Sequence, residues 1–212
     1  MIRIAIVGTG NISHAHVEAY LRFPERCKIV ALVDIVPEKA QKMKEDYHLT
    51  EAEVYDDHQK ILSRKDIDLV DVCTPPYVHA SISINSLRSG KNVVCEKPMA
   101  AAVEEAQRMI DVQRRTGHIL MLGHNQRLVR THIRAKELLE AGAIGEILSV
   151  QTNFKHSGPE SWSVERGGTW FFSKNKAAFG VLGDLGSHKF DLVRYLLGDE
   201  IQSIFATLQT LD

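Results

Sequence analysis

The stretch AIVGTGNISHAH, residues 5–16, decides the fold of this chain. It joins an apolar, β-branched run to a glycine-rich turn and then to a segment of helical period. Gly8 permits a tight turn after the strand, and Gly10 permits a ligand to approach the backbone closely. A helix is expected to begin at Ile12, and its N-terminus presents unbonded N–H groups to an anion. The stretch therefore predicts a site for the pyrophosphate of a dinucleotide.

Two further residues bear on this prediction. Ser13 stands where the third small residue of the fingerprint is expected, and its short side chain still allows close packing of helix on strand. A glycine-rich turn without a ligand would look the same. Asp34 ends the second strand, where a carboxylate accepts hydrogen bonds from ribose hydroxyls and repels a 2′-phosphate, so NAD is expected rather than NADP. The alternative is that Asp34 only favours the dipole of the next helix.

Strands and helices alternate over residues 1–125. Short apolar runs, typical of strands buried on both faces, occupy Ile2–Val7, Lys28–Val33, Asp68–Cys73, Asn92–Cys95 and Ile119–Leu122. Segments of helical period occupy Ile12–Phe23, Pro37–Tyr47, Asp57–Ser63, His79–Arg88 and Val103–Thr116. This alternation predicts an α/β domain with a doubly wound parallel sheet.

Residues 126–212 follow a different pattern and predict the beginning of a second domain. Helices are expected at Val129–Ala141 and Val181–Leu197, and strands at Glu146–Phe154 and Gln202–Leu211. A polar stretch from Lys155 to Lys176, which holds Trp162 and Trp170, lies between them. So few strands cannot close an independent core, so this domain is expected to be incomplete.

Composition excludes several classes of protein. Hydrophobic residues make up 44% and charged residues 25%, as in ordinary globular proteins. The net charge of -1 gives no basic excess for a nucleic-acid partner. No apolar run reaches the roughly 18 residues of a membrane helix, and the N-terminus does not resemble a signal peptide. Three widely spaced cysteines, Cys27, Cys73 and Cys95, indicate reduced thiols and a cytoplasmic location.

The motif CEKP, residues 95–98, carries a candidate catalytic lysine. Glu96 and Lys97 follow a predicted strand at the carboxyl edge of the sheet, which is where open α/β sheets bind ligands. A cationic amine at this edge can stabilise an alkoxide as it develops during oxidation of an alcohol. The alternative is an ordinary solvated lysine.

The motif GDLGSHKFDL, residues 183–192, places Asp184 and His188 four positions apart on one face of a predicted helix. A neutral imidazole can accept a hydroxyl proton near neutral pH while the carboxylate orients it. A surface contact between the two is the alternative. No third ligand is spaced to complete a metal site with them, so no metal is expected.

Taken together, GTGNIS, VDVCTPPYVHA, GKNVVCEKPMA and GDLGSHKFDL resemble the Gfo/Idh/MocA family of NAD(P)-dependent sugar and polyol oxidoreductases. The resemblance covers essentially the whole chain. It implies a Rossmann domain followed by an α+β domain with a mainly antiparallel open sheet. It also implies that Lys97, Asp184 and His188 form the catalytic group.

The same resemblance implies roles for other residues. Asp34 and the loop residues Gly8, Gly10, Asn11 and Ile12 would hold the cofactor. Thr74, Pro75 and His79 would line its groove, and Glu96 would lie near the nicotinamide ribose. The resemblance also implies that three consecutive residues face the substrate: Asn125, Gln126 and Arg127. The alternative for Arg127 is that it is a solvated charge between the domains.

The function expected from these residues is hydride transfer between NAD and a secondary hydroxyl of a sugar, polyol or related small molecule. Two other functions stay open. One is a module that senses a dinucleotide or sugar without turnover, and the other is an NAD-dependent glycosidase. Family members continue into strands that form substrate walls and dimer contacts, so a homo-oligomer, dimer or tetramer, is expected if the second domain is complete.

Overall fold

The computed structural model describes residues 1–155, 157–161, 163, 170–177, 179–207 and 209. The chain forms two units. The first contains Met1–Gly123 and His156–Asp184, and the second contains His124–Lys155 and Leu185–Asp212. Trp162, from the polar stretch singled out above, lies outside the described residues.

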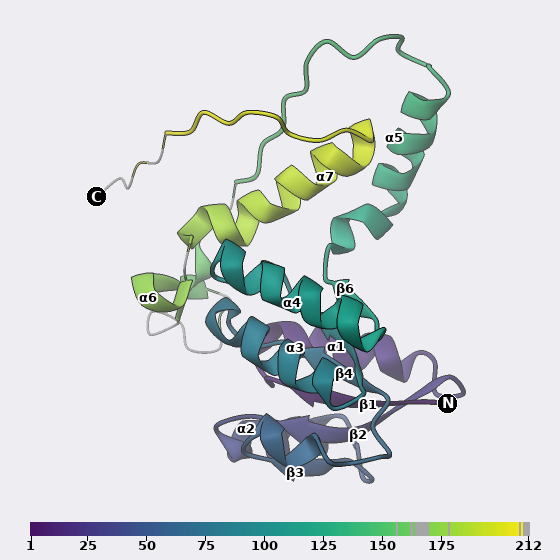
Figure 1. The fold of residues 1–212 in the computed structure, drawn as a ribbon, viewed down its shortest axis with the longest axis vertical. Helices are drawn as coiled ribbons and strands as arrows, with labels where there is room; N and C mark the ends of the chain where they lie inside the picture. The colour runs from purple at the N-terminus through teal and green to yellow at the C-terminus, as the bar shows by residue number, and fades with distance from the viewer. Residues whose placement is uncertain (156, 162, 164–169, 178, 208, 210–212) are drawn as a thin grey trace. The chain divides into compact units, whose positions relative to one another are not determined.

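A six-stranded parallel sheet forms the centre of the first unit (Figure 1). Its strands are β1 Ile2–Val7, β2 Cys27–Val33, β3 Glu53–Tyr55, β4 Leu69–Val72, β5 Asn92–Cys95 and β6 Leu120–Leu122. They lie in the order β3-β2-β1-β4-β5-β6. This order confirms the predicted doubly wound sheet. It reverses between β1 and β4, and the carboxyl ends of strands at such a point are where these sheets bind ligands.

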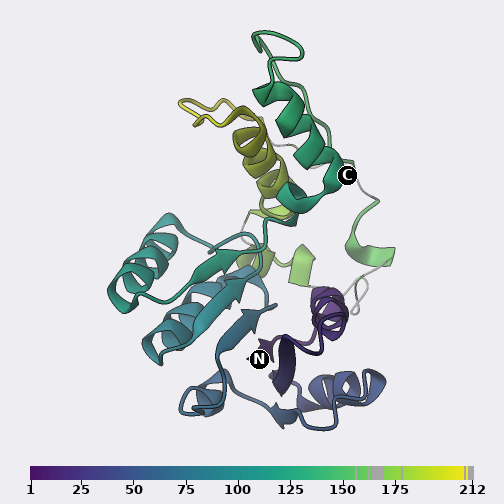
Figure 2. The same ribbon diagram turned by 90° about the vertical axis from the view of Figure 1, so that its right-hand side faces the viewer.

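Two pairs of helices cover the sheet. Helices α1 Asn11–Leu21 and α2 Pro37–Asp46 lie on one face, and α3 His79–Arg88 and α4 Val103–Thr116 lie on the other (Figure 2). Because side chains along a strand alternate between faces, Val70 and Val72 of β4 pack toward α3 and α4. Asp71 and Cys73 therefore point to the side of α1, where the polar part of the site lies.

Two short segments of the first unit differ from the prediction. The helix expected at Asp57–Ser63 is a single 3-10 turn, His58–Ile61, which begins where the Asp57 carboxylate accepts a 2.9 Å hydrogen bond from the Gln59 N–H. Strand β3 was not predicted, because three residues at the edge of a sheet are too few to show an alternating pattern.

The remaining elements of the first unit are short. Those that the structure describes include the 3-10 turns Pro76–Val78, Pro159–Ser161 and Trp170–Phe172 and the helix α6 Lys174–Ala177. In the part of the chain that the structure describes, no helix has the length and apolar character needed to cross a membrane.

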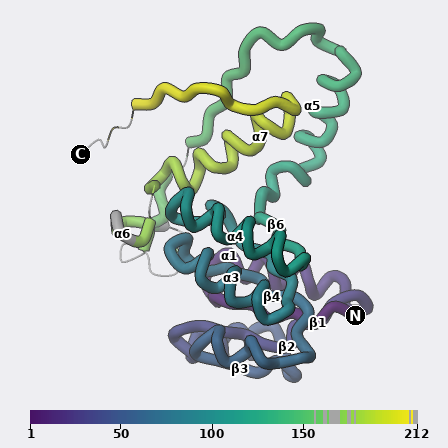
Figure 3. Tube along the Cα trace, viewed as in Figure 1, coloured from purple at the N-terminus to yellow at the C-terminus, as the bar shows by residue number. Residues whose placement is uncertain are grey.

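The second unit is built on two helices. A 3-10 turn, Asn125–Leu128, leads into α5 Arg130–Glu140, which packs against α7 Ser187–Leu197 (Figure 3). Both helices were predicted, but the second is preceded by a π-helical turn, Leu182–Gly186, instead of a continuous α-helix.

The two strands predicted for the second domain are wrong for the residues that the structure describes. Glu146–Phe154 and the described part of Gln202–Leu211 form no strand, and these residues build no antiparallel sheet. Leu148 is 88% exposed and Phe205 is 96% exposed. A strand forms only where a neighbour bonds its backbone N–H and C=O groups, and no described segment pairs with either of these. Leu208, Thr210 and Leu211 of the predicted strand lie outside the described residues.

Candidate functional site

The glycine-rich loop after β1 lies against the end of β4. Gly8 has a φ of +91°, and a Cβ added there would lie 2.8 Å from the carbonyl carbon and oxygen of Cys73. Only glycine fits this position. Gly10 differs, because no atom of the described residues lies within 4 Å of a Cβ added to it. The loop backbone therefore packs tightly against the end of β4 at Gly8 and leaves space at Gly10. A ligand needs such space to approach the backbone.

The N-terminus of α1 follows this loop. Gly10 is its N-cap residue, and among the described residues no side chain caps the N–H groups of the first turn. Ser13 is fully buried and donates its hydroxyl to the Gly10 carbonyl oxygen at 2.6 Å, so its side chain packs between helix and sheet as its small size predicted. Asn11 and Ile12 are exposed at the start of the helix.

The carboxylate of Asp34 reaches this loop from the end of β2. Thr9 donates both its backbone N–H and its hydroxyl to Asp34 Oδ2, each at 2.8 Å. The Val36 N–H donates to Oδ1 at 2.9 Å. The structure thus brings Asp34 to the loop that the sequence analysis assigned to the same cofactor.

The segment after β4 contributes Thr74 and Pro75. The Thr74 Oγ1 atom is buried and has no hydrogen-bond partner among the described residues. His79 is fully buried, with Nδ1 2.8 Å from the Pro98 carbonyl oxygen and Nε2 2.7 Å from the Thr74 carbonyl oxygen. His79 therefore holds the segments after β4 and β5 together from inside and does not itself reach the surface of a groove.

Lys97 and Asp184 form the most direct polar contact of the site. Lys97 Nζ lies 2.6 Å from Asp184 Oδ1 and 2.9 Å from the Asp184 backbone oxygen. Their side chains are 14% and 26% exposed, so the pair is largely shielded from water and yet reachable. Asp184 lies in the π-helical turn, and His188 is the second residue of α7. The regular helical spacing assumed for Asp184 and His188 is therefore replaced by a wider turn.

Glu96 sits next to this pair along the chain. Its Oε2 accepts the Lys97 N–H at 3.2 Å, and its Oε1 lies 3.1 Å from His16 Nε2. A Cβ added to Gly123 would lie 2.6 Å from Glu96 Oε1. The absence of a side chain at Gly123 thus makes room for this carboxylate.

His16 also contacts a second carboxylate, that of Asp71. His16 Nδ1 lies 2.8 Å from Asp71 Oδ2, which also accepts the Tyr20 hydroxyl at 2.8 Å. Burial would lower the pKa of His16, but hydrogen bonds, that to Asp71 first, raise it well above its ordinary value. Burial would raise the pKa of Glu96, but its bond to His16 and the charge of that ring hold it below its ordinary value.

His16 was not predicted as a site residue, although the sequence contains two signals that point to it. Asp71 interrupts an apolar strand that is buried on both faces, and a buried carboxylate needs a partner. His16 lies one position from the buried Val17 and four from Tyr20, on the stripe of α1 that faces the sheet.

His16, Asp71 and Cys73 place one potential metal ligand each within 4.8 Å of one another. Hydrogen bonds already connect these groups, since Asp71 accepts from His16 and from the Cys73 thiol, the latter at 3.7 Å. Burial raises the pKa of Cys73 to about 12, so its thiol keeps its proton. The contacts within the cluster are those of a proton-bearing network.

The second unit holds the other residues assigned from sequence. Arg127 donates Nε and Nη2 to the two oxygens of the buried Asp191, at 2.8 and 2.5 Å. The Gln126 carbonyl oxygen lies 2.8 Å from His132 Nδ1, and Asn125 begins the same 3-10 turn. The His188 ring lies 6.5 Å from that of Phe154, centre to centre. Arg127 is therefore an ion-paired residue of this unit.

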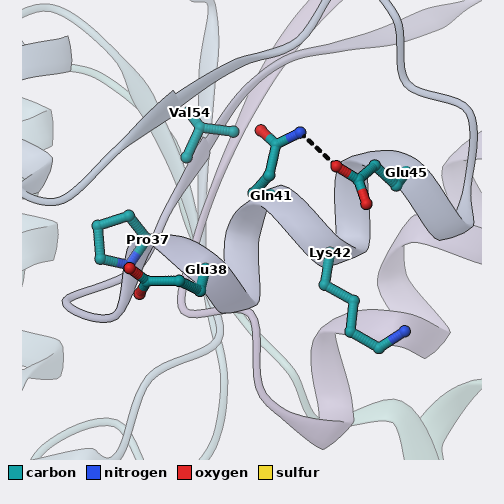
Figure 4. Close-up of a pocket in the computed structure, with 6 residues that line it drawn as sticks. All are labelled: Pro37, Glu38, Gln41, Lys42, Glu45 and Val54. Carbon is teal, nitrogen blue, oxygen red and sulfur yellow. Dashed lines mark hydrogen bonds between the residues drawn. The ribbon is translucent and has the colours of Figure 1, made fainter.

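A separate hollow lies along α2 of the first unit (Figure 4). It is lined by Pro37, Glu38, Gln41, Lys42, Glu45 and Val54. Gln41 donates to Glu45 at 2.7 Å across one helical turn. None of these six residues belongs to the site around Lys97.

Comparison with known proteins decides the family. Residues 2–124 match the model of the "Oxidoreductase family, NAD-binding Rossmann fold", and residues 132–212 match that of the "GFO/IDH/MocA C-terminal domain". The chain belongs to the Gfo/Idh/MocA oxidoreductase family. This confirms the resemblance drawn from the four motifs, and the strand order confirms the Rossmann fold that it implied.

Relatives of this Gfo/Idh/MocA chain include named dehydrogenases. Levoglucosan dehydrogenase of Pseudarthrobacter phenanthrenivorans is 31% identical, over 99% of this chain and 54% of the relative. Myo-inositol 2-dehydrogenase of Thermotoga maritima is 27% identical, over 97% of this chain and 58% of the relative. The structure of GenD2 from gentamicin A biosynthesis in complex with NAD superposes with a TM-score of 0.84 at 28% identity, over 93% of this chain and 54% of that one. The chain thus spans somewhat more than half the length of these relatives.

Proposed function

We propose that this chain carries the dinucleotide site and the catalytic group of an NAD-dependent dehydrogenase that oxidises a secondary hydroxyl of a sugar, polyol or related small molecule. The observation that carries the proposal is the Lys97–Asp184 pair, 2.6 Å between Nζ and Oδ1, next to Glu96 at the carboxyl edge of the sheet. The names of the relatives support a sugar or polyol substrate. In this proposal residues 1–125 bind the dinucleotide and residues 126–212 begin the substrate domain.

Three features of the first unit fit a dinucleotide. In the described part of the chain, Gly10 leaves open space where a side chain would project and the first turn of α1 has no side-chain cap, so its N–H groups suit a pyrophosphate. The buried Thr74 hydroxyl has no partner among the described residues and suits a polar ligand atom. The Asp34 carboxylate suits ribose hydroxyls and opposes a 2′-phosphate.

We assign NAD to the residues that carry these features and to their neighbours. They are Gly8, Gly10, Asn11, Ile12, Asp34, Thr74, Pro75 and Glu96, with His79 holding Thr74 from inside the fold. When bound, NAD supplies the acceptor of a hydride.

The residues of the chain then have separate tasks. Lys97 binds the hydroxyl oxygen of the substrate and stabilises its negative charge as the proton leaves. Asp184 holds the lysine amine through both a carboxylate and a backbone oxygen, which fixes the direction of the amine before a substrate arrives. The family resemblance assigns removal of the hydroxyl proton to His188.

The test is an assay of NADH formation by the full-length protein with a panel of sugars and polyols. Lys97→Met keeps the length of the side chain and removes its charge, and we expect it to lower turnover by at least about 100-fold. Lys65→Met is the matched control, because Lys65 is an exposed lysine that precedes β4 at the opposite edge of the sheet. Unchanged turnover in Lys97→Met, or no turnover of any panel member by the unmodified protein, would contradict the proposal.

A further inference from the structure

His16 and Asp71 have no task in the chemistry proposed above. His16 belongs to α1, the helix that begins at the glycine-rich loop. Its ring contacts Asp71 on β4 and Glu96 directly after β5. One side chain thus joins the helix at the dinucleotide site to the strand end that carries Lys97.

The geometry fixes the charge of this ring. Its two nitrogens each face a carboxylate oxygen, Nδ1 at 2.8 Å from Asp71 and Nε2 at 3.1 Å from Glu96. A neutral imidazole has a single N–H, so one of the carboxylates would face a nitrogen lone pair. Only the protonated ring donates to both. The direction of the His16 pKa, above its ordinary value, agrees with this.

Among the residues that the structure describes, no other group packed around the ring supplies the positive charge that the two carboxylates need. The Tyr20 hydroxyl donates to Asp71 but is neutral, and the Cys73 thiol beside Asp71 keeps its proton because burial raises its pKa to about 12. Lys97 meets Glu96 through its backbone N–H, while its ammonium pairs with Asp184. His16 is therefore the cation that balances Asp71 and Glu96 within the first unit.

We propose that His16 is a positioning residue. As an imidazolium it bonds the Glu96 carboxylate and thereby holds the backbone of Glu96 and Lys97 in the position from which Lys97 acts on the substrate. This inference rests on the proposed dehydrogenase function, because Lys97 is the catalytic residue that it serves. Glu96 is the point of transfer, since it bonds His16 with one oxygen and the Lys97 backbone with the other. The same bond connects the helix at the dinucleotide site with the catalytic lysine.

The first test requires no turnover. Histidine ring nitrogens of the full-length protein are labelled with ¹⁵N and followed by NMR from about pH 6 to about pH 9, a range that brackets the ordinary histidine pKa. We expect one histidine to keep both nitrogens protonated throughout, and its signals to be missing in His16→Gln. A His16 ring that titrates near its ordinary pKa, or that stays in one neutral tautomer, would overturn the proposal.

The second test uses whichever substrate the panel identifies. We expect His16→Gln to lower kcat by about 10- to 100-fold with KM within about threefold, because a displaced catalytic group slows chemistry more than binding. The losses in His16→Gln and Glu96→Gln should not add in the double variant, since both remove the same contact. Additive losses would overturn the proposal.

His14→Gln is the matched control. His14 lies two positions earlier on the same helix, and its ring contacts the Tyr47 hydroxyl at 3.0 Å, a partner outside the network. We expect kcat of this variant to stay within about twofold of the unmodified protein. A loss equal to that of His16→Gln would show that any change on α1 has this effect. If the unmodified protein turns over nothing, the dehydrogenase proposal fails, and the nitrogen titration still decides the charge of His16.

Discussion

One oxygen of the Asp34 carboxylate accepts two hydrogen bonds from Thr9, one from its backbone N–H and one from its hydroxyl, each 2.8 Å long. Together with the bond from the Val36 N–H to the other oxygen, they fix the carboxylate at the end of β2. Its negative charge is therefore held beside the glycine-rich loop in a defined orientation.

This orientation predicts the choice of cofactor. We expect NAD to bind at least about tenfold more tightly than NADP, because the fixed carboxylate accepts from ribose hydroxyls and repels a 2′-phosphate. Asp34→Ser should narrow the gap, chiefly by improving NADP. Calorimetric titration of both cofactors measures this. Thr9→Val is the control, since it removes one bond to Asp34 and keeps the charge, so the preference for NAD should persist. Equal affinities in the unmodified protein would show that Asp34 does not face the ribose.

The two loop glycines should separate stability from binding. Gly8→Ala forces a Cβ to within 2.8 Å of the Cys73 backbone at a φ of +91°, and we expect it to lower the free energy of unfolding by about 2 kcal/mol or more. Gly10→Ala meets no atom within 4 Å and has a φ of −79°, so the free energy of unfolding should change by less than about 1 kcal/mol while NAD affinity falls. Urea unfolding and NAD titration of both variants provide the measurements. Full NAD affinity in a folded Gly10→Ala would place the pyrophosphate elsewhere.

The stability of the first unit should depend on pH through His16. Its pKa is higher in the folded protein than in the unfolded chain, where it is about 6.5, so its contribution is greatest below that pH and shrinks as the pH rises. Between about pH 7 and 9 the free energy of unfolding should fall more steeply in the unmodified protein than in His16→Gln, by up to about 1.4 kcal/mol per pH unit. Urea unfolding at several pH values tests this, and equal slopes would contradict it.

Glu96 should act in the opposite direction. Its pKa is lower in the folded protein, so its contribution is present above the unfolded value of about 4.3 and is lost as the pH falls below it. The His16–Glu96 pair therefore stabilises the first unit most between these two values. Glu96→Gln should therefore reduce the fall in the free energy of unfolding on the acid side of the profile. An unchanged acid side would show that the bond between Glu96 and His16 is absent.

In the second unit the Arg127–Asp191 pair should be structural. Asp191 is 6% exposed, so removing its partner leaves a buried carboxylate without its cation. We expect Arg127→Met to lower the free energy of unfolding by about 1 to 3 kcal/mol, less than for a fully buried pair because Arg127 is partly exposed. Arg130→Met, at the exposed start of α5, is the control. If the two variants were equally stable, the Arg127–Asp191 pair would not be structural, and Arg127 would be available to bind a substrate.

The sheet and the residues at its carboxyl edge were predictable because their signals are local. A parallel strand buried on both faces is a continuous apolar run, and the residue that follows the run lies at the edge that binds ligands, as Asp34 and Lys97 do. Strand β3 escaped prediction because three residues carry too little pattern. The alternation of apolar and polar residues in Glu146–Phe154 led to a wrong strand prediction for a different reason. A strand forms only beside a neighbouring strand, and the sequence of the segment does not show whether that neighbour is present.

The contacts of His16 were out of reach of the same reasoning. Asp71 and Glu96 lie 55 and 80 positions from His16, and only the fold brings them together. Periodicity places His16 on the buried face of α1, but it does not say which strand end lies opposite. The sequence pattern also does not predict the π-helical turn at Asp184. The contact between this carboxylate and Lys97 is seen only in the structure.

Two of the three cysteines are buried inside the first unit, Cys73 directly after β4 and Cys95 at the end of the neighbouring β5, while Cys27 is partly exposed. Burial raises the pKa of each of the two inner thiols to about 12, so neither forms the thiolate that attacks alkylating reagents. A thiol-reactive dye should therefore modify Cys27 first and reach the inner pair only when the sheet opens. At a dye concentration where labelling outpaces reclosing, the rate of that slow labelling equals the rate at which the sheet opens locally.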